Sequence, residues 1–114
     1  MDRKRDLVFF KNYFYEFFEV QKENVKEKID YVLFLITTLE RIPKKFFSDI
    51  EGQAGLFEIK IEFESNIYRI FCCFDEGRIV VLFNAFQKKT QKTPQKEIEK
   101  ALRLKREYFE LKKH

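Results

Sequence analysis

The sequence contains little of several residue types, and each shortage excludes a class of protein. Its 114 residues include only three Gly and two Pro, which excludes collagen-like and linker-like chains. No stretch of about 18 apolar residues occurs, so we expect no membrane-spanning helix. The basic residues 3–5 are followed by the apolar run 7–10, which is too short for the core of a signal peptide. We therefore expect a cytoplasmic protein.

Cysteine and histidine are also scarce. The two cysteines, Cys72 and Cys73, are neighbours, and neighbours on a strand point to opposite faces. We predict two buried thiols rather than a disulfide. The only histidine is His114, which disfavours a metal site on the cysteines and a histidine-based catalytic triad. No P-loop or dinucleotide-binding fingerprint occurs either, and we expect no metal and no cofactor.

The sequence is rich in charged and in hydrophobic residues. Hydrophobic residues make up 45% and charged residues 37%, which fits one soluble globular domain spanning residues 1–114. Residues 1–77 carry 12 Lys or Arg against 15 Asp or Glu, a net charge of −3, whereas residues 78–114 carry 11 against 4, a net charge of +7. The basic C-terminal third suggests an anionic partner such as nucleic acid. A solvated basic helix face is the alternative.

The first half of the chain has the pattern of one strand and two helices. A short strand is expected around residues 7–10, and 3- and 4-residue aromatic spacing predicts a short helix within 12–20. The clearest helix is predicted over 22–41, ending before Pro43. Its inner face consists of Val25, Ile29, Val32, Leu33, Ile36 and Leu39. Residues 42–55 are expected to be a connection.

The second half predicts a three-strand meander and a final helix. Alternation over 57–64 predicts a strand with one polar face, a second strand follows at 67–74, and a tight turn at 75–77 leads to a third strand at 79–86, covered on both faces. Residues 87–92 are expected to form a loop. Thr93 is expected to cap a helix that starts at Pro94 and runs toward 111. Its inner face is expected to contain Ile98, Ala101, Leu102 and Phe109. The fold class is therefore α+β.

Three basic features are candidates for function. Lys60 lies on the polar face of its strand, and Arg69 interrupts an apolar strand, where an arginine is expensive unless it is paired or faces a cleft. Lys88, Lys89 and Lys92, with Thr90, lie before a helix N-terminus, which favours phosphate binding. Each feature also has a plain reading: a solvated lysine, a buried ion pair and a solubilising loop. If the strands are adjacent, Lys60, Arg69 and Lys88 can converge on a phosphodiester.

Three sequence blocks resemble the RelE/ParE toxin superfamily, and specifically its phage-derived, HigB-like branch. They are G-L-F-E-I-K at 55–60, N-I-Y-R-I-F at 66–71 and F-Q-K-K-T-Q-K-T-P at 86–94, and the resemblance covers roughly residues 52–106. It implies a small RelE-like domain: a mainly antiparallel four-stranded sheet with helices packed against one face, a C-terminal helix and a basic cleft.

The resemblance also implies a function. It indicates the toxin of a type II toxin–antitoxin pair, which cleaves mRNA in the ribosome without a metal. The expected partners are mRNA, the ribosome and a HigA-like helix-turn-helix antitoxin, through which alone the protein would reach operator DNA. Arg69 matches the arginine on the third strand that contacts the scissile phosphate. Lys60 matches the basic position on the second strand, and Lys88 and Lys89 match the basic positions just after the fourth strand. Lys60, Arg69 and Lys88 are the expected catalytic residues. Lys89, Lys92 and Thr90 are expected to bind the RNA backbone.

The general acid and base remain open at this point. Some members carry a Tyr or His after the basic run, whereas residues 91–95 contain neither; Tyr108 and His114 are the next ones. Lys60 could deprotonate the 2′-OH, with Glu58 or Glu62 as the fallback base. Two other functions also stay open: a gyrase-binding toxin of the ParE type, and a degenerate module that only binds. Phe14, Phe17 and Phe18 are expected in the core rather than in an antitoxin-docking patch.

Overall fold

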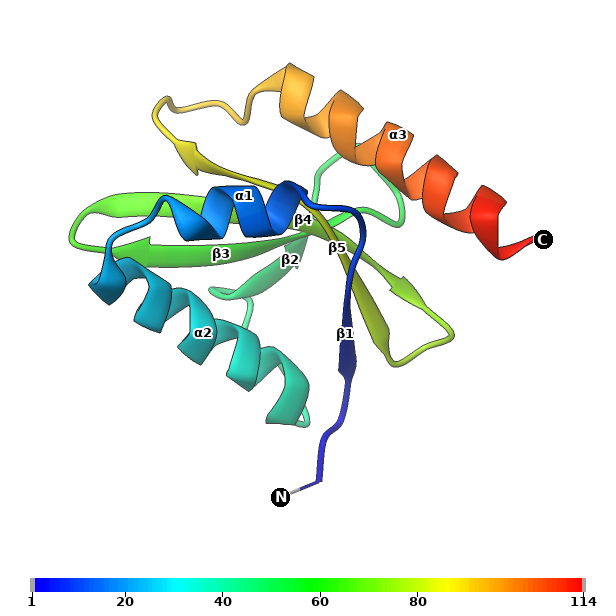
Figure 1. Ribbon diagram of the computed structural model, residues 1–114, viewed down its shortest axis with the longest axis horizontal. Coiled ribbons are helices and arrows are strands. Elements are labelled where there is room, and N and C mark those ends of the chain that lie inside the picture. The colour runs from blue at the N-terminus through cyan, green and yellow to red at the C-terminus, as the bar shows by residue number, and fades with distance from the viewer. Residues whose placement is uncertain (1, 114) are drawn as a thin grey trace.

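The computed structural model describes residues 2–113, which form a strongly twisted sheet with helices on both faces (Figure 1). In chain order the elements are β1 (Asp6–Phe9), α1 (Tyr13–Glu19), α2 (Glu23–Thr38), β2 (Phe47–Asp49), β3 (Phe57–Phe63), β4 (Asn66–Asp75), β5 (Ile79–Lys88) and α3 (Gln95–Lys112). The α+β class predicted from the sequence is confirmed.

The sheet has five strands rather than the expected four, in the order β1-β5-β4-β3-β2. The additional strand, β2, lies in the segment predicted to be a connection and pairs antiparallel with residues 57–59 of β3. Its three residues are too few to produce a recognisable alternation, which explains why the sequence pattern missed it. The sheet is mixed, because β1 pairs parallel with β5 while the other neighbours are antiparallel.

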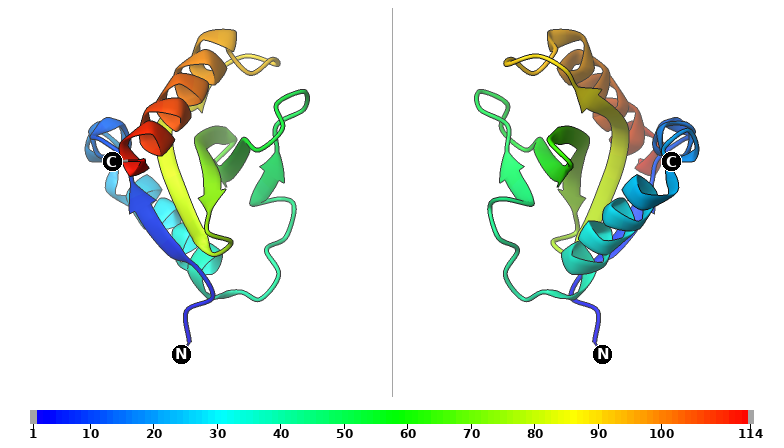
Figure 2. Two further views of the ribbon diagram at one scale, coloured as in Figure 1. Left: turned by 90° about the vertical axis from the view of Figure 1, so that its right-hand side faces the viewer. Right: turned by 90° about the vertical axis from the view of Figure 1, so that its left-hand side faces the viewer.

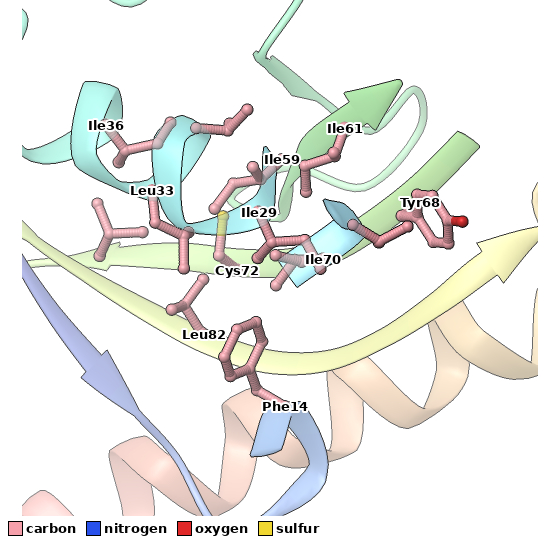
Figure 3. Packing of buried hydrophobic residues seen from close by; sticks show 13 residues of the cluster. Phe14, Ile29, Leu33, Ile36, Ile59, Ile61, Tyr68, Ile70, Cys72 and Leu82 are labelled. Atoms are coloured by element: carbon pink, nitrogen blue, oxygen red, sulfur yellow. The ribbon is translucent and has the colours of Figure 1, made fainter. Parts of the chain in front are cut away.

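The helices divide between the two faces of the sheet. On one face, α1 and α2 cover a cluster that contains Ile29, Ile59, Ile70 and Leu82, all completely buried (Figure 3). On the other face, α3 covers a second cluster around Phe71 and Phe83. The expectation that the helices pack against one face is therefore wrong for α3. Alternate residues of the same strands are buried in the two clusters, so both faces of the sheet need a covering helix. The two views in Figure 2 show the strong twist of the sheet between the helices.

The two cysteines and the aromatic N-terminal stretch behave as predicted. Cys72 faces α2 and Cys73 faces α3, and both are free and buried. Burial raises the pKa of both thiols, that of Cys73 to about 11. Phe14 is buried, and Phe17 and Phe18 pack against the same cluster, which confirms the core assignment.

The helix ends differ from the predicted ones. Helix α2 ends at Thr38, and the Arg5 guanidinium donates to the carbonyls of Ile36, Leu39 and Glu40 at 2.7–3.0 Å. Helix α3 begins at Gln95 with Pro94 in the capping position and without a side-chain cap, so the prediction of a Thr93 cap is wrong. The buried face of α3 consists of Ile98, Ala101 and Leu104, while Leu102 and Phe109 pack at its margin.

Strand β5 is central and covered on both faces, as predicted, but it is longer than expected. It continues through Gln87 and Lys88, which were predicted to lie in a loop. A bulge interrupts its pairing with β4: between the pairs Ile70–Ala85 and Cys72–Leu82, β5 has one residue more than β4. The bulge decides which face the last residues of β5 occupy, and therefore where Lys88 lies.

No helix within residues 2–113 combines the length and apolar character needed to cross a bilayer.

Candidate functional site

Three cations lie side by side on neighbouring strands, and we call Lys60, Arg69 and Lys88 the cationic row. Lys60 of β3 pairs directly with Arg69 of β4. Lys88 of β5 pairs with Ile67, two residues before Arg69 on the same face of β4. The predicted convergence on one sheet face is therefore present. This face is the one that α3 covers farther along, so the row occupies its uncovered end (Figure 1).

Arg69 is the most buried member of the row. Its guanidinium forms an ion pair with the buried Glu58 of β3, and its side chain is only 12% exposed. The Nε atom has no hydrogen-bond partner among the described residues. Burial lowers the pKa of Arg69, although an arginine stays charged at any physiological pH. The ion pair considered from the sequence is thus present, and it holds the guanidinium in place at the centre of the row.

The two lysines of the row differ in their surroundings. Lys60 forms an ion pair with Glu62, with 2.9 Å between Nζ and Oε1. Lys88 forms no ion pair with any carboxylate of residues 2–113, and it lies next to two other cations. Partial burial lowers the pKa of Lys88, and the charges of Arg69 and Lys60 lower it further. The pKa of Lys88 is therefore below that of an ordinary lysine.

The expected RNA-binding residues lie immediately beyond the row. Lys89, Thr90 and Lys92 are exposed in the segment between β5 and α3, where the Thr90 hydroxyl donates to the carbonyl of Lys92 at 2.8 Å. Lys88, Lys89 and Thr90, with Ile67, line an open hollow of about 440 Å³. The basic segment is thus continuous with the cationic row.

Asn84 positions the start of α3, a role that the sequence pattern did not reveal. Its Nδ2 donates to the carbonyl and to the carboxylate of Glu97, at 3.0 and 2.9 Å. A polar residue in an otherwise apolar strand was the available signal, because a buried amide needs a partner. The Glu97 carboxylate lies in the first turn of α3. That turn therefore already contains an anion, which weakens the prediction of a phosphate site at this N-terminus.

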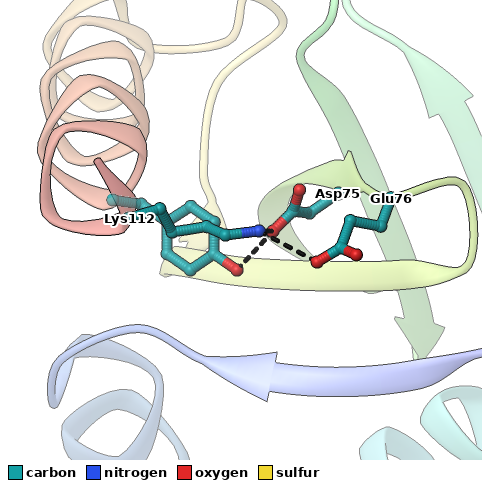
Figure 4. A network of polar contacts seen from close by, with 4 residues as sticks. Asp75, Glu76 and Lys112 are labelled. Carbon is teal, nitrogen blue, oxygen red and sulfur yellow. Dashed lines mark hydrogen bonds and ion pairs between the residues drawn. The ribbon is translucent and has the colours of Figure 1, made fainter. Parts of the chain in front are cut away.

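Tyr108 lies away from the cationic row. Its hydroxyl donates to Asp75 at 2.7 Å, and Lys112 donates to Asp75 and Glu76 at 2.6 and 3.0 Å (Figure 4). Asp75 is at the far end of β4, roughly 20 Å along the strand from Arg69. Burial and the Asp75 carboxylate raise the pKa of Tyr108 to about 12. Tyr108 is therefore a structural residue here, and His114 lies outside the described residues.

The described residues offer no metal site. Within 2–113, no three His, Cys, Asp or Glu side chains come together in a group that could hold a metal ion. The acidic residues nearest the row, Glu58 and Glu62, are each paired with a cation. The charged groups at this end of the sheet are the cations of the row and these two carboxylates.

Comparison with known families shows a match over most of the chain. The model of the family described as Phage derived protein Gp49-like (DUF891) matches residues 16–106, which include the whole cationic row and the basic segment after it. This family is known in toxin–antitoxin contexts. No curated protein matches the chain.

Proposed function

The chain belongs to the phage-derived Gp49-like family, and we propose that it is a type II toxin of the RelE/ParE superfamily, in its HigB-like branch. The proposed activity is metal-independent cleavage of mRNA, which stops translation. The observation that carries the proposal is the cationic row, because three cations on one sheet face can neutralise the negative charge of an RNA phosphate.

The proposed reaction uses the RNA's own 2′-OH as the nucleophile. Its oxygen attacks the adjacent phosphorus, the bond from phosphorus to the 5′-oxygen breaks, and the products are a 2′,3′-cyclic phosphate and a 5′-OH end. Arg69 stabilises the extra negative charge of the transition state, because its guanidinium can bind two phosphate oxygens at once. The dependence on the 2′-OH would restrict the reaction to RNA.

Two proton transfers accompany this reaction. Lys88 is assigned the general acid that protonates the leaving 5′-oxygen, because its pKa is already lowered by its surroundings. The 2′-OH proton goes to Glu58, whose carboxylate contacts Arg69 and so lies where the phosphate is bound. Lys60 donates to Glu62 and is assigned to orienting the phosphate, in place of the base role considered from the sequence. Lys89, Lys92 and Thr90 hold the neighbouring backbone.

The proposed partners follow from the same assignment. The mRNA is cut on the ribosome, and a HigA-like antitoxin with a helix-turn-helix silences the toxin. Operator DNA is bound only by the complex of the two proteins. The rival functions, gyrase binding and binding without catalysis, have no need of convergent phosphate ligands on this face.

The test is inducible expression of the wild type and Arg69→Lys, followed by primer extension on a translated reporter mRNA. Arg69→Lys keeps the charge beside Glu58, whereas Arg69→Ala would leave a buried carboxylate unpaired and would confuse lost activity with lost stability. We expect wild-type cuts inside the reading frame and a loss of about 10²–10³ in cutting for Arg69→Lys. The exposed Arg106→Lys is the matched control.

Other outcomes would overturn the proposal in distinct ways. Growth arrest with DNA damage and no mRNA cuts would indicate a gyrase-binding toxin. Growth without arrest would indicate a module that only binds. Cuts that persist at full frequency in Arg69→Lys would remove Arg69 from the proposed site.

A further inference from the structure

A second basic hollow lies at the edge of the sheet, beside the cationic row. It has a volume of about 210 Å³ and is lined by Lys28 of α2, Lys45 and Phe46 before β2, and Lys60 and Glu62 of β3. We call it the β3-edge hollow. Lys60 belongs to both the hollow and the cationic row, so the two form one continuous surface.

The edge is open because β2 is short. Its pairing with β3 covers residues 57–59, and the amide of Lys60 donates to the carbonyl of Phe46 at 2.9 Å. Within residues 2–113, no strand pairs with the β3 residues after Lys60 on this side. The gap lies between the end of that pairing and α2, where Lys28 and Lys45 reach it from segments that are distant in the sequence.

The β3-edge hollow carries an excess of positive charge. Three ammonium groups line it against the single carboxylate of Glu62, whose side chain is 62% exposed. The hydrogen bond from Lys60 lowers the pKa of Glu62, and the charges of Lys28 and Lys45 add to the effect. Both lysines therefore lie close enough to act on an anion in the hollow.

We propose that the β3-edge hollow binds a backbone phosphate of the RNA strand as it leaves the cationic row. This inference rests on the proposed function and extends it: the bound RNA would reach from the segment after β5, across Arg69, to Lys28 and Lys45. The incoming phosphate takes the place of the Glu62 carboxylate as the partner of Lys60. Glu62 therefore competes with RNA for this lysine.

An exposed aromatic ring next to the hollow supports RNA as the occupant. The Nζ of Lys28 lies 5.6 Å from the ring centre of Tyr31, which is 52% exposed. An exposed ring beside a phosphate-binding lysine provides a surface on which an unpaired base can stack. A protein partner with acidic side chains would use the lysines but would gain less from the ring.

The experiment measures binding separately from cleavage. The probe is a fluorescein-labelled RNA octamer with 2′-O-methyl groups, which removes the nucleophile, and its affinity is followed by fluorescence anisotropy at several salt concentrations. Lys28→Glu and Lys45→Glu are compared with Lys26→Glu and Lys44→Glu, which make the same charge change on the same segments outside the hollow.

We expect Lys28→Glu and Lys45→Glu each to weaken binding about tenfold and to make the salt dependence shallower by about one counterion. Glu62→Gln should tighten binding several-fold, since it removes the competing carboxylate. A merely structural role of these residues would not weaken RNA binding in the lysine variants and tighten it in Glu62→Gln. Tyr31→Leu should weaken binding by about tenfold as well, through lost stacking.

Two results would overturn the inference. Equal affinities for the hollow and control variants, with wild-type binding intact, would reject the β3-edge hollow and leave the proposed function standing. An octamer that does not bind the wild type at all would reject the β3-edge hollow as a site for free RNA, whereas the proposed function is decided separately by mRNA cutting on translating ribosomes. Unchanged mRNA cutting by Lys28→Glu and Lys45→Glu, alongside wild-type cutting, would also reject the hollow alone.

Discussion

The two ends of the sheet face under α3 contain charged groups in opposite arrangements. At the covered end, Asp75 and Glu76 accept from Lys112, and Asp75 also accepts from Tyr108, so that each donor has an acceptor (Figure 4). At the uncovered end, the cationic row has three cations for two carboxylates, and Lys88 has no carboxylate partner among the described residues. At the covered end two carboxylates face one ammonium group and each donor is paired, whereas the uncovered end has an excess of positive charge.

The covered end of this face therefore contributes to the stability of the fold, and the uncovered end is available for binding. The paired network at the covered end fastens the end of α3 to the β4–β5 hairpin, and its donors are already bound to protein carboxylates. An excess of cations, held at a fixed spacing by hydrogen-bonded strands, remains available for an anion. The Asn84–Glu97 contact lies between the two ends and holds the first turn of α3, where the helix begins, against β5.

Among the variants that compare the two ends, the largest effect is expected at the uncovered end, in Lys88→Arg. An arginine keeps the charge but does not release a proton, so we expect cleavage to slow by about 10²-fold while RNA binding is unchanged. Since the pKa of Lys88 is below its usual 10.5, the wild-type rate should fall with rising pH before that value is reached, and this alkaline limb should be absent in Lys88→Arg.

The measurement is a pH–rate profile on an RNA substrate. Lys89→Arg, the same change at the exposed neighbouring residue, is the control and should keep the wild-type profile. An unchanged rate in Lys88→Arg would show that this residue is not the acid, and the comparison between the two ends would then rest on binding alone.

A smaller effect is expected at the covered end, in Tyr108→Phe. The variant removes the hydroxyl that donates to Asp75 and should lower the free energy of unfolding by about 1 kcal/mol. Chemical denaturation measures this change, and mRNA cutting should remain at the wild-type level. A loss of cutting without a loss of stability would place Tyr108 in the reaction and would break the division between the two ends.

The smallest expected effect is a pH dependence of stability from Asp75. Hydrogen bonds from Lys112 and Tyr108 lower the pKa of Asp75 in the folded protein. A lowered carboxyl pKa stabilises the fold above the unfolded value of about 3.9, and the contribution is lost as pH falls through the folded value. The melting temperature of the wild type should therefore fall more steeply on acidification than that of Asp75→Asn.

Thermal unfolding followed by circular dichroism over the acid range provides this measurement. Glu110→Gln is the control, because among residues 2–113 the exposed Glu110 carboxylate pairs with Lys113 alone, and the variant should keep the acid dependence of the wild type. Parallel acid dependences for Asp75→Asn and the wild type would contradict the assigned role of the network.

Elements with a full hydrophobic period were predicted from the sequence. The alternation in β3 put Lys60 on a polar face, and the stripe from Val25 to Ile36 gave α2 and its buried side. The wrong predictions concern segments that show no hydrophobic periodicity. Strand β2 is too short to show one, and the polar end of β5 reads as a loop although it pairs with Ile67 and Tyr68. Pairing with a partner strand, rather than local pattern, defines such residues as strand.

The candidate site was predicted in a similar, partial way. Arg69 was conspicuous because an arginine in an apolar strand requires a reason, and Lys88 belonged to a basic run. Lys28 and Lys45 carried no signal, since an exposed lysine on a helix or in a loop looks the same whatever lies next to it. Asn84 was visible as an exception, but its partner on α3 could not be identified from spacing.

Local chemistry thus determined which residues are buried and which segments form the long helices and strands, because periodicity records the contact of one side of a segment with the core. Tertiary structure alone decided which of the charged residues meet. Strand order brings Lys60, Arg69 and Lys88 into one row, and the position of α2 places Lys28 beside Lys60. At the far end of the same face, the position of α3 brings Tyr108 and Lys112 into contact with Asp75. These contacts depend on strand register and on helix placement, which cannot be read from any single segment of the sequence.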